Sequence, residues 1–138
     1  MSLSASSSTS GSSSFSAPVA LLGRAMLASL FIPAGFSKLT AIGGTAGYFA
    51  SLGLPMPTVT AVVIGLVELL GGLAVLVGFK TRIAALLLAV FTIAASFVAH
   101  TNFAGGMQLL MFQKNVSIAG GLLLLVALGA GSLSIDRK

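Results

Sequence analysis

The sequence contains no cysteine, no tryptophan and only one histidine. Without cysteine the chain cannot form a disulfide, a thiolate metal site, an iron–sulfur cluster or a thioether link to haem. A single histidine also excludes a bis-histidine haem within one chain, and we expect no metal site. Any electron-transfer chemistry of this protein must therefore use a bound organic carrier or a partner subunit.

Charged side chains are also scarce: they make up 7% of the 138 residues, whereas 57% are hydrophobic. An ordinary soluble domain has about a quarter of its residues charged. Four apolar runs, 18–37, 58–79, 83–100 and 116–133, are each long enough to cross a hydrocarbon core of about 30 Å as a helix. They do not alternate apolar and polar residues as barrel strands would. The sequence therefore predicts an all-α, polytopic membrane protein with four transmembrane helices in an antiparallel bundle.

The segments between these runs predict the two ends of the bundle. Residues 39–57 contain the aromatic pair Tyr48–Phe49 ahead of a Gly and a Pro, which predicts a short interfacial helix. Only Lys80–Thr81–Arg82 separates the second and third runs, so these helices are expected to be antiparallel neighbours. Residues 102–113 are apolar but too short to span, and they predict a second interfacial segment at the same end as the first.

The N-terminal tail has a different composition from the rest of the chain. Residues 1–16 contain ten serines and are predicted to be disordered, ahead of a membrane domain over 17–136. A signal peptide is the competing interpretation, but no basic residue precedes the first run and Arg24 lies inside it.

The distribution of basic residues predicts the orientation in the membrane. The net charge of +5 comes from isolated residues beside apolar runs, so we expect contact with the lipid bilayer and none with nucleic acid. The end of the bundle with both termini has four basic residues, and the opposite end has two. This excess favours both termini in the cytoplasm. The two groups are Lys80, Arg82, Arg137 and Lys138, and Lys38 and Lys114.

Glu68 lies in the middle of the second run, where a charged side chain costs roughly 2.5–3.5 kcal/mol to insert. Gly65, Glu68 and Gly72 share one helix face, and the glycines allow a neighbouring helix to approach closely. We therefore expect the carboxylate to point into the bundle.

Arg24 is the expected partner of Glu68, because it lies near the start of the first run and has a long side chain. Arg24, Phe31 and Lys38 recur every seven residues on one face, together with Gly35, and we expect that face to meet the face of Glu68. Two interpretations stay open. Either the ion pair only fixes the helix register, or Glu68 takes and releases protons in a polar cavity.

A second group of polar residues lies near the end of the bundle away from the termini: Lys38, His100, Lys114 and Asn115. Thr92 and Ser96 lead inward from His100 along one face of the third helix. These side chains could simply extend to lipid headgroups. Alternatively they converge on one pocket, where two ammonium groups, an imidazole and an amide would bind a quinone carbonyl or another electron-rich small molecule. His100 could exchange a proton there.

Several short motifs follow one another along residues 17–136. They are Phe31-x-x-x-Gly35-x-x-Lys38, Tyr48-Phe49 followed by Leu52-Gly53-Leu54-Pro55, Gly65-x-x-Glu68-x-x-Gly71-Gly72, Gly78-Phe79 with Thr81-Arg82, His100, Gln113-Lys114-Asn115, Gly120-Gly121, and Ser134 to Asp136. In this order and spacing they resemble the DoxX family of small bacterial four-helix membrane proteins. The sequence departs from the family pattern at Gly129-Ala130-Gly131, where Gly-Pro-Gly is expected, and the site residues are unaffected.

The resemblance implies a protein of the bacterial inner membrane, of a kind often labelled as an oxidoreductase. Related proteins are described as a subunit of a thiosulfate:quinone oxidoreductase, and as the membrane member of a mycobacterial complex with superoxide dismutase and a sulfurtransferase. Because this chain alone has no group that holds a metal or a haem, we expect oxidoreductase activity to belong to an assembly. This chain would bind quinone or dock soluble redox enzymes or other membrane subunits.

Two other functions stay open from the sequence. A small proton-coupled transporter would also have one membrane carboxylate, here Glu68, in a four-helix protein of this size. In the small multidrug resistance transporters, however, that carboxylate is in the first helix and largely unpaired, whereas the basic residues near Glu68 disfavour a cation substrate. The third hypothesis is a membrane scaffold or stress-response protein without a small-molecule site.

Overall fold

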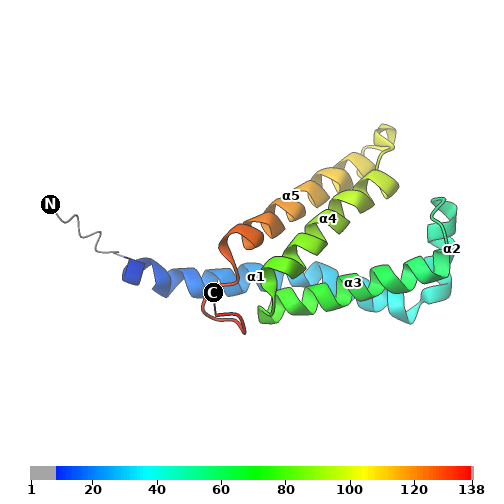
Figure 1. Cartoon of the computed structure of the whole chain (residues 1–138). Helices are drawn as coiled ribbons and strands as arrows, with labels where there is room; N and C mark the ends of the chain where they lie inside the picture. Colours follow the sequence, from blue (N-terminus) through cyan, green and yellow to red (C-terminus); the bar gives the residue numbers. More distant parts are fainter. Residues whose placement is uncertain (1–8, 138) are drawn as a thin grey trace.

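The computed structural model of the chain describes residues 9–137, so that residues 1–8 and Lys138 lie outside the description (Figure 1). Over the described range the structure contains helices and turns but no strand. The elements in chain order are α1 (Thr9–Thr40), α2 (Ile42–Ser51), α3 (Pro57–Val77), α4 (Thr81–Ala99), the 3-10 turn η1 (Phe103–Gly105) and α5 (Met107–Leu128). Helices α1, α3, α4 and α5 are long and apolar enough to span a membrane, which confirms the predicted all-α fold with four spans.

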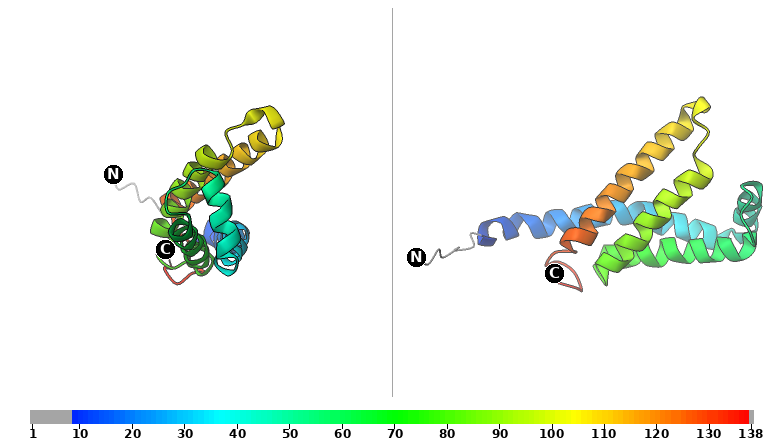
Figure 2. Two further views of the ribbon diagram at one scale, coloured as in Figure 1. Left: turned by 90° about the vertical axis from the view of Figure 1, so that its right-hand side faces the viewer. Right: turned by 45° about the horizontal axis from the view of Figure 1, so that its top comes forward.

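The four long helices form two antiparallel pairs, α1 with α3 and α4 with α5. The pairs lie close together near the α3–α4 turn and diverge toward α2 and η1, as the views in Figures 1 and 2 show. We call these the narrow end and the wide end. Both long connections lie at the wide end, as the sequence predicted.

The close packing of α1 on α3 depends on glycine. A Cβ atom added at Gly35 would overlap the backbone amide of Leu69 and would lie 2.6 Å from the carbonyl oxygen of Gly65. A Cβ at Gly72 would come within 3.1 Å of the Phe31 side chain. The expectation that the Gly35 face of the first helix meets the face containing Gly65, Glu68 and Gly72 is therefore confirmed.

Apolar residues from all four long helices meet in one core. Phe31 of α1, Val75 of α3, Leu88 of α4 and Leu122 of α5 are fully or almost fully buried in a single cluster. Much of the remaining apolar surface faces outward, as it does in a protein whose solvent is lipid.

The segment Leu133–Asp136 folds back over the narrow end. The backbone N–H groups of Ile135 and Asp136 donate to the carbonyl oxygens of Val77 (3.0 Å) and Gly78 (2.8 Å) at the end of α3. The Asp136 carboxylate accepts hydrogen bonds from the backbone N–H groups of Lys80 and Thr81, and from the Thr81 hydroxyl, each at 2.8 Å. Asp136 therefore caps the N-terminus of α4 from a distant part of the chain.

Two helices differ from the predictions in their bounds. Helix α1 begins at Thr9, so residues 9–16 of the segment predicted as disordered are helical. Extending an existing helix gains one hydrogen bond per residue and avoids the cost of nucleation, and serine is only mildly unfavourable in a helix.

The C-terminal helix is shifted toward the N-terminus relative to its predicted span of 116–133. Residues 107–113, predicted as an interfacial segment, are the first turns of α5, and only η1 is separate from it. Gly106 before the helix, and Gly129 and Gly131 after it, have positive φ angles and so set its ends. By contrast, α2 matches the short helix predicted in the first connection, and α3 and α4 match their predicted ranges to within two residues.

Candidate functional site

Glu68 forms an ion pair with Lys38. The Lys38 Nζ lies 2.7 Å from Glu68 Oε1, and the two side chains are 27% and 7% exposed. The α1–α3 register explains this pairing, because Gly35 packs against Leu69 and Lys38 lies one turn further along α1. A nearly buried carboxylate thus keeps a cationic partner in the middle of an apolar protein.

Arg24 has different partners from those predicted. Its guanidinium is fully buried and donates hydrogen bonds to the carbonyl oxygens of Val75 (3.2 Å), Leu76 (2.9 Å) and Leu133. The predicted Arg24–Glu68 ion pair is therefore wrong. Glu68 is level with the Gly35 turn, about 16 Å from Arg24 along α1. Arg24 instead satisfies carbonyls in the last turn of α3, which have no partner within that helix.

A cavity of about 380 Å³ is lined by residues of both helix pairs, toward the wide end. It contains five of the six predicted site residues, Lys38, Glu68, His100, Lys114 and Asn115, and Arg24 is not among its lining residues. These side chains come from α1, α3 and α5 and from the end of α4. We call this cavity the polar pocket.

The polar pocket has more basic than acidic groups. Lys38 is paired with Glu68, whereas Lys114 has no acidic partner among residues 9–137. The Asn115 side-chain amide donates a hydrogen bond to Ser96 Oγ (2.9 Å), which in turn donates to the Thr92 carbonyl oxygen (3.0 Å). These hydrogen bonds tie the Asn115 side chain of α5 to α4. The ammonium of Lys114, which has no acidic partner in the described part of the chain, is available to a ligand.

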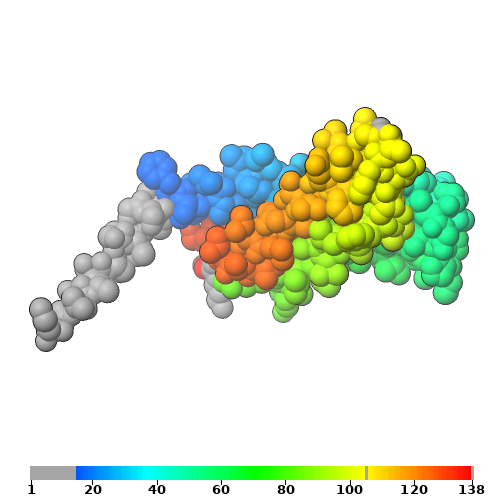
Figure 3. Space-filling view, turned by 90° about the horizontal axis from the view of Figure 1, so that it is seen from above, coloured from blue at the N-terminus to red at the C-terminus, as the bar shows by residue number. Residues whose placement is uncertain are grey.

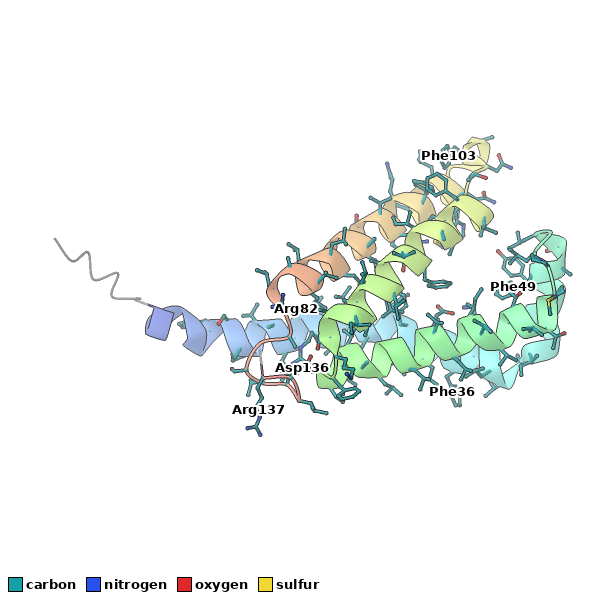
Figure 4. The ribbon with its side chains drawn as sticks, in the orientation of Figure 1. Phe36, Phe49, Arg82, Phe103, Asp136 and Arg137 are labelled. Carbon is teal, nitrogen blue, oxygen red and sulfur yellow. The ribbon has the colours of Figure 1, made fainter. Side chains whose placement is uncertain are left out.

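Apart from Thr92, the rest of the pocket wall is largely apolar and partly aromatic. Helix α2 contributes Tyr48 and Phe49, whose ring centroids are 6.0 Å apart, and Phe31 and Phe91 come from α1 and α4. Figure 4 shows Phe49 on the α2 side of the opening between the helix pairs and Phe103 at the tip of the α4–α5 pair. Arg82 and Asp136 lie at the opposite, narrow end.

Sequence reasoning did not assign these aromatic residues to a site. Tyr48 and Phe49 were visible as an aromatic pair, but the pattern indicated only a position at the membrane interface. Phe91 lies within a continuous apolar run, so the sequence offers no signal that separates it from a lipid-facing or core residue.

Comparison with known proteins places the chain in a family. The family model for DoxX matches residues 19–101. The chain is 46% identical over 117 residues to the inner membrane protein YqjF of Escherichia coli (strain K12), covering 85% of this chain and 88% of that protein. It is 39% identical over 123 residues to the inner membrane protein YphA of the same strain, covering 86% and 88%.

A third relative is a protein of Bacillus subtilis (strain 168), provisionally named as the oxidoreductase CatD. The match is 40% identical over 75 residues and covers 54% of each chain. No solved structure gave a significant match.

The fold and the comparisons together define a small multi-pass membrane protein with four spanning helices. The chain belongs to the DoxX family.

Proposed function

We propose that the protein is the membrane subunit or docking component of a redox assembly, and that its polar pocket binds a quinone. The observation that carries this proposal is the pocket itself, which combines an unpaired ammonium, an imidazole and an amide with an aromatic wall. Its volume of about 380 Å³ is within the range of about 300–1,000 Å³ that is typical of small-molecule sites.

The chemistry of the lining residues fits a quinone head group. Lys114 and Asn115 are hydrogen-bond donors suited to carbonyl oxygens, and the aromatic wall matches a flat apolar ring. A bound quinone would supply reversible two-electron, two-proton chemistry. The part of this chain would be to orient the ring, to exclude water, and to hold a proton at the His100 imidazole or the Glu68 carboxylate.

Electrons would have to come from another protein. The sequence has no cysteine and one histidine, so the chain alone has no ligand set for an iron–sulfur cluster or a bis-histidine haem. The donor is proposed to be a soluble redox enzyme or another membrane subunit. The oxidoreductase name of the partial relative CatD supports this direction.

Orientation in the membrane is part of the proposal. The narrow end contains Lys80 at the start of α4 together with Arg82 and Arg137. Lys38 in the last turn of α1 and Lys114 of α5 lie toward the wide end, where both line the polar pocket. The excess of basic residues at the narrow end favours a cytoplasmic location for that end, with the polar pocket toward the opposite side of the inner membrane.

The direct test is saturable binding of a short-tailed ubiquinone analogue to the purified protein in phosphatidylcholine nanodiscs. Replacing Lys114 by Met should weaken binding roughly tenfold, the loss expected for one hydrogen bond from a charged donor. Lys80→Met is the matched control, because Lys80 lies at the other end of the molecule, and it should leave binding unchanged. An absence of saturable binding, or an equal loss in both variants, would disprove a quinone site.

A transporter function predicts a different result. Proton-coupled uptake of a cation into vesicles, abolished by Glu68→Ala, would replace the redox proposal. The geometry disfavours this outcome, because the ammonium of Lys38 already lies against the Glu68 carboxylate and Lys114 adds a further positive charge.

A further inference from the structure

A second, larger cavity of about 930 Å³ runs between α1 and α5 on the narrow-end side of the polar pocket. Its walls are almost entirely apolar, with large side chains such as Met26, Leu27 and Leu124, and glycine at positions 23 and 121. We call it the α1–α5 groove. The space-filling view in Figure 3 shows the face on which α5 (orange) lies beside α1 (blue).

The groove adjoins the polar pocket along α1. Leu30 lines both cavities. On α1 the residues that line the two cavities include a stripe with steps of three or four, which is one continuous helix face. The members of this stripe are Ser16, Ala20, Gly23, Leu27, Leu30, Ala34 and Lys38.

Helix α5 shows the same continuity independently. Its stripe begins in the polar pocket at Lys114 and continues along the groove with steps of three or four through Ile118, Gly121, Leu125 and Leu128. One face of each helix therefore passes from a charged end in the polar pocket to a largely apolar stretch in the groove, whose polar lining residues are Ser16, Arg24 and Ser132. This is the polarity profile of an amphiphile with a polar head and a long tail.

We infer that the ligand of the polar pocket carries a long apolar tail, such as the polyisoprenoid tail of a membrane quinone, and that this tail lies in the α1–α5 groove. The inference rests on the proposed function and specifies the substrate class of the same site. From Leu30 back to Ser16 an α-helix rises about 21 Å, so the groove accommodates an extended tail and not only its first carbons.

The tail would gain little from the hydrophobic effect, because in a membrane it leaves lipid and not water. Its contribution comes from packing against fixed side chains and from holding the head group in the pocket. We therefore expect a several-fold preference for a tailed ligand, and not the far larger preference that transfer from water would give.

The experiment compares two probes in phosphatidylcholine nanodiscs: a tail-free ubiquinone head group, and the same head group with a long isoprenoid tail. Gly121→Leu places a side chain in the groove, because a Cβ at this position meets only the flexible Leu27 side chain, at 3.6 Å or more. Gly23→Leu does the same from α1, where a Cβ meets nothing within 4 Å. Gly120→Leu is the matched control, since that position is equally open but does not line the groove.

The unmodified protein should bind the tailed probe several-fold more tightly than the tail-free probe. Both groove variants should lose this preference and keep their affinity for the tail-free probe, and Gly120→Leu should keep both properties. Equal affinity of the unmodified protein for the two probes, or a preference that persists in both groove variants, would overturn the inference and assign the groove to a lipid acyl chain or a neighbouring helix. Failure of the tail-free probe to bind would instead count against the quinone pocket itself.

Discussion

Arg24 and Lys38 are two basic residues on one face of α1, and they have different roles. Lys38 neutralises a carboxylate at the polar pocket, whereas Arg24 satisfies backbone carbonyls at the narrow end. Their heptad spacing puts them on the same face but separates them by about 21 Å along the helix. Position along the helix axis therefore decides whether the side chain binds a carboxylate, as Lys38 does, or backbone carbonyl oxygens, as Arg24 does.

The Lys38–Glu68 pair predicts a non-additive mutant cycle. Lys38→Met leaves a nearly buried carboxylate without its partner, and it should lower the free energy of unfolding by roughly 1–3 kcal/mol. Adding Glu68→Gln should restore part of this loss, because the double variant contains no unpaired charge. The measurement is denaturation by SDS in mixed micelles. Simple addition of the two single effects would show that the residues do not interact.

Arg24 should be far more sensitive to substitution than Arg82, although both donate to carbonyls near the end of a neighbouring helix. Arg24→Met removes three hydrogen bonds of a buried side chain and should cost roughly 2–4 kcal/mol in the same assay. Arg82 is exposed and its bonds to Val126 and Ala127 are 3.4 and 3.3 Å long, so Arg82→Met should cost less than about 1 kcal/mol. Similar costs for the two variants would contradict a structural role for Arg24.

At the scale of helices, the α1–α3 contact depends on Gly35. Gly35→Ala would force the two backbones apart and should destabilise the protein by roughly 1–3 kcal/mol. Gly23→Ala in the same helix meets nothing within 4 Å and should stabilise it by up to about 1 kcal/mol, because alanine is the better helix former. SDS denaturation of both variants checks the contrast. Equal and small effects would mean that α1 and α3 are not in close contact.

The elements themselves were largely predictable, but their register was not. Continuous apolar runs predict spans because the membrane imposes a minimum length, and the glycines at 35, 65 and 72 identified the packed faces. Sliding α1 by a few turns keeps the same faces together, so the sequence could not decide whether Arg24 or Lys38 meets Glu68. The end of α5 was mispredicted because residues 129–133 contain no charged side chain that would interrupt the run, and hydropathy gives no information on the glycine φ angles that end the helix.

At the scale of the whole molecule, the polar pocket depends on the divergence of the two helix pairs. The sequence identified which polar residues could gather, since polar side chains are rare enough in this chain to stand out individually. It did not identify the aromatic wall or the α1–α5 groove, because apolar residues that line a cavity look the same in sequence as those that face lipid.

The arrangement predicts which positions share a side of the membrane. The chain has no cysteine, so single-cysteine variants can be labelled without background. Lys80→Cys and Arg137→Cys, both exposed at the narrow end, should react with a membrane-impermeant maleimide only in inverted vesicles, whereas Gln113→Cys should react only in right-side-out vesicles. Labelling of Lys80→Cys and Gln113→Cys from one side would contradict the four-span arrangement. Labelling of all three from the reversed sides would contradict only the orientation.

The cap that Asp136 places on α4 also has a consequence for how the protein is made. Asp136 leaves the ribosome more than fifty residues after Thr81, whose backbone and hydroxyl it binds. Until then the first amides of α4 lack this cap, and Arg24 lacks the Leu133 carbonyl. A ribosome that stops before residue 133 would release four apolar helices without the hydrogen bonds that the C-terminal segment makes at the narrow end. The narrow end can therefore be assembled only after residues 133–136 have been synthesised.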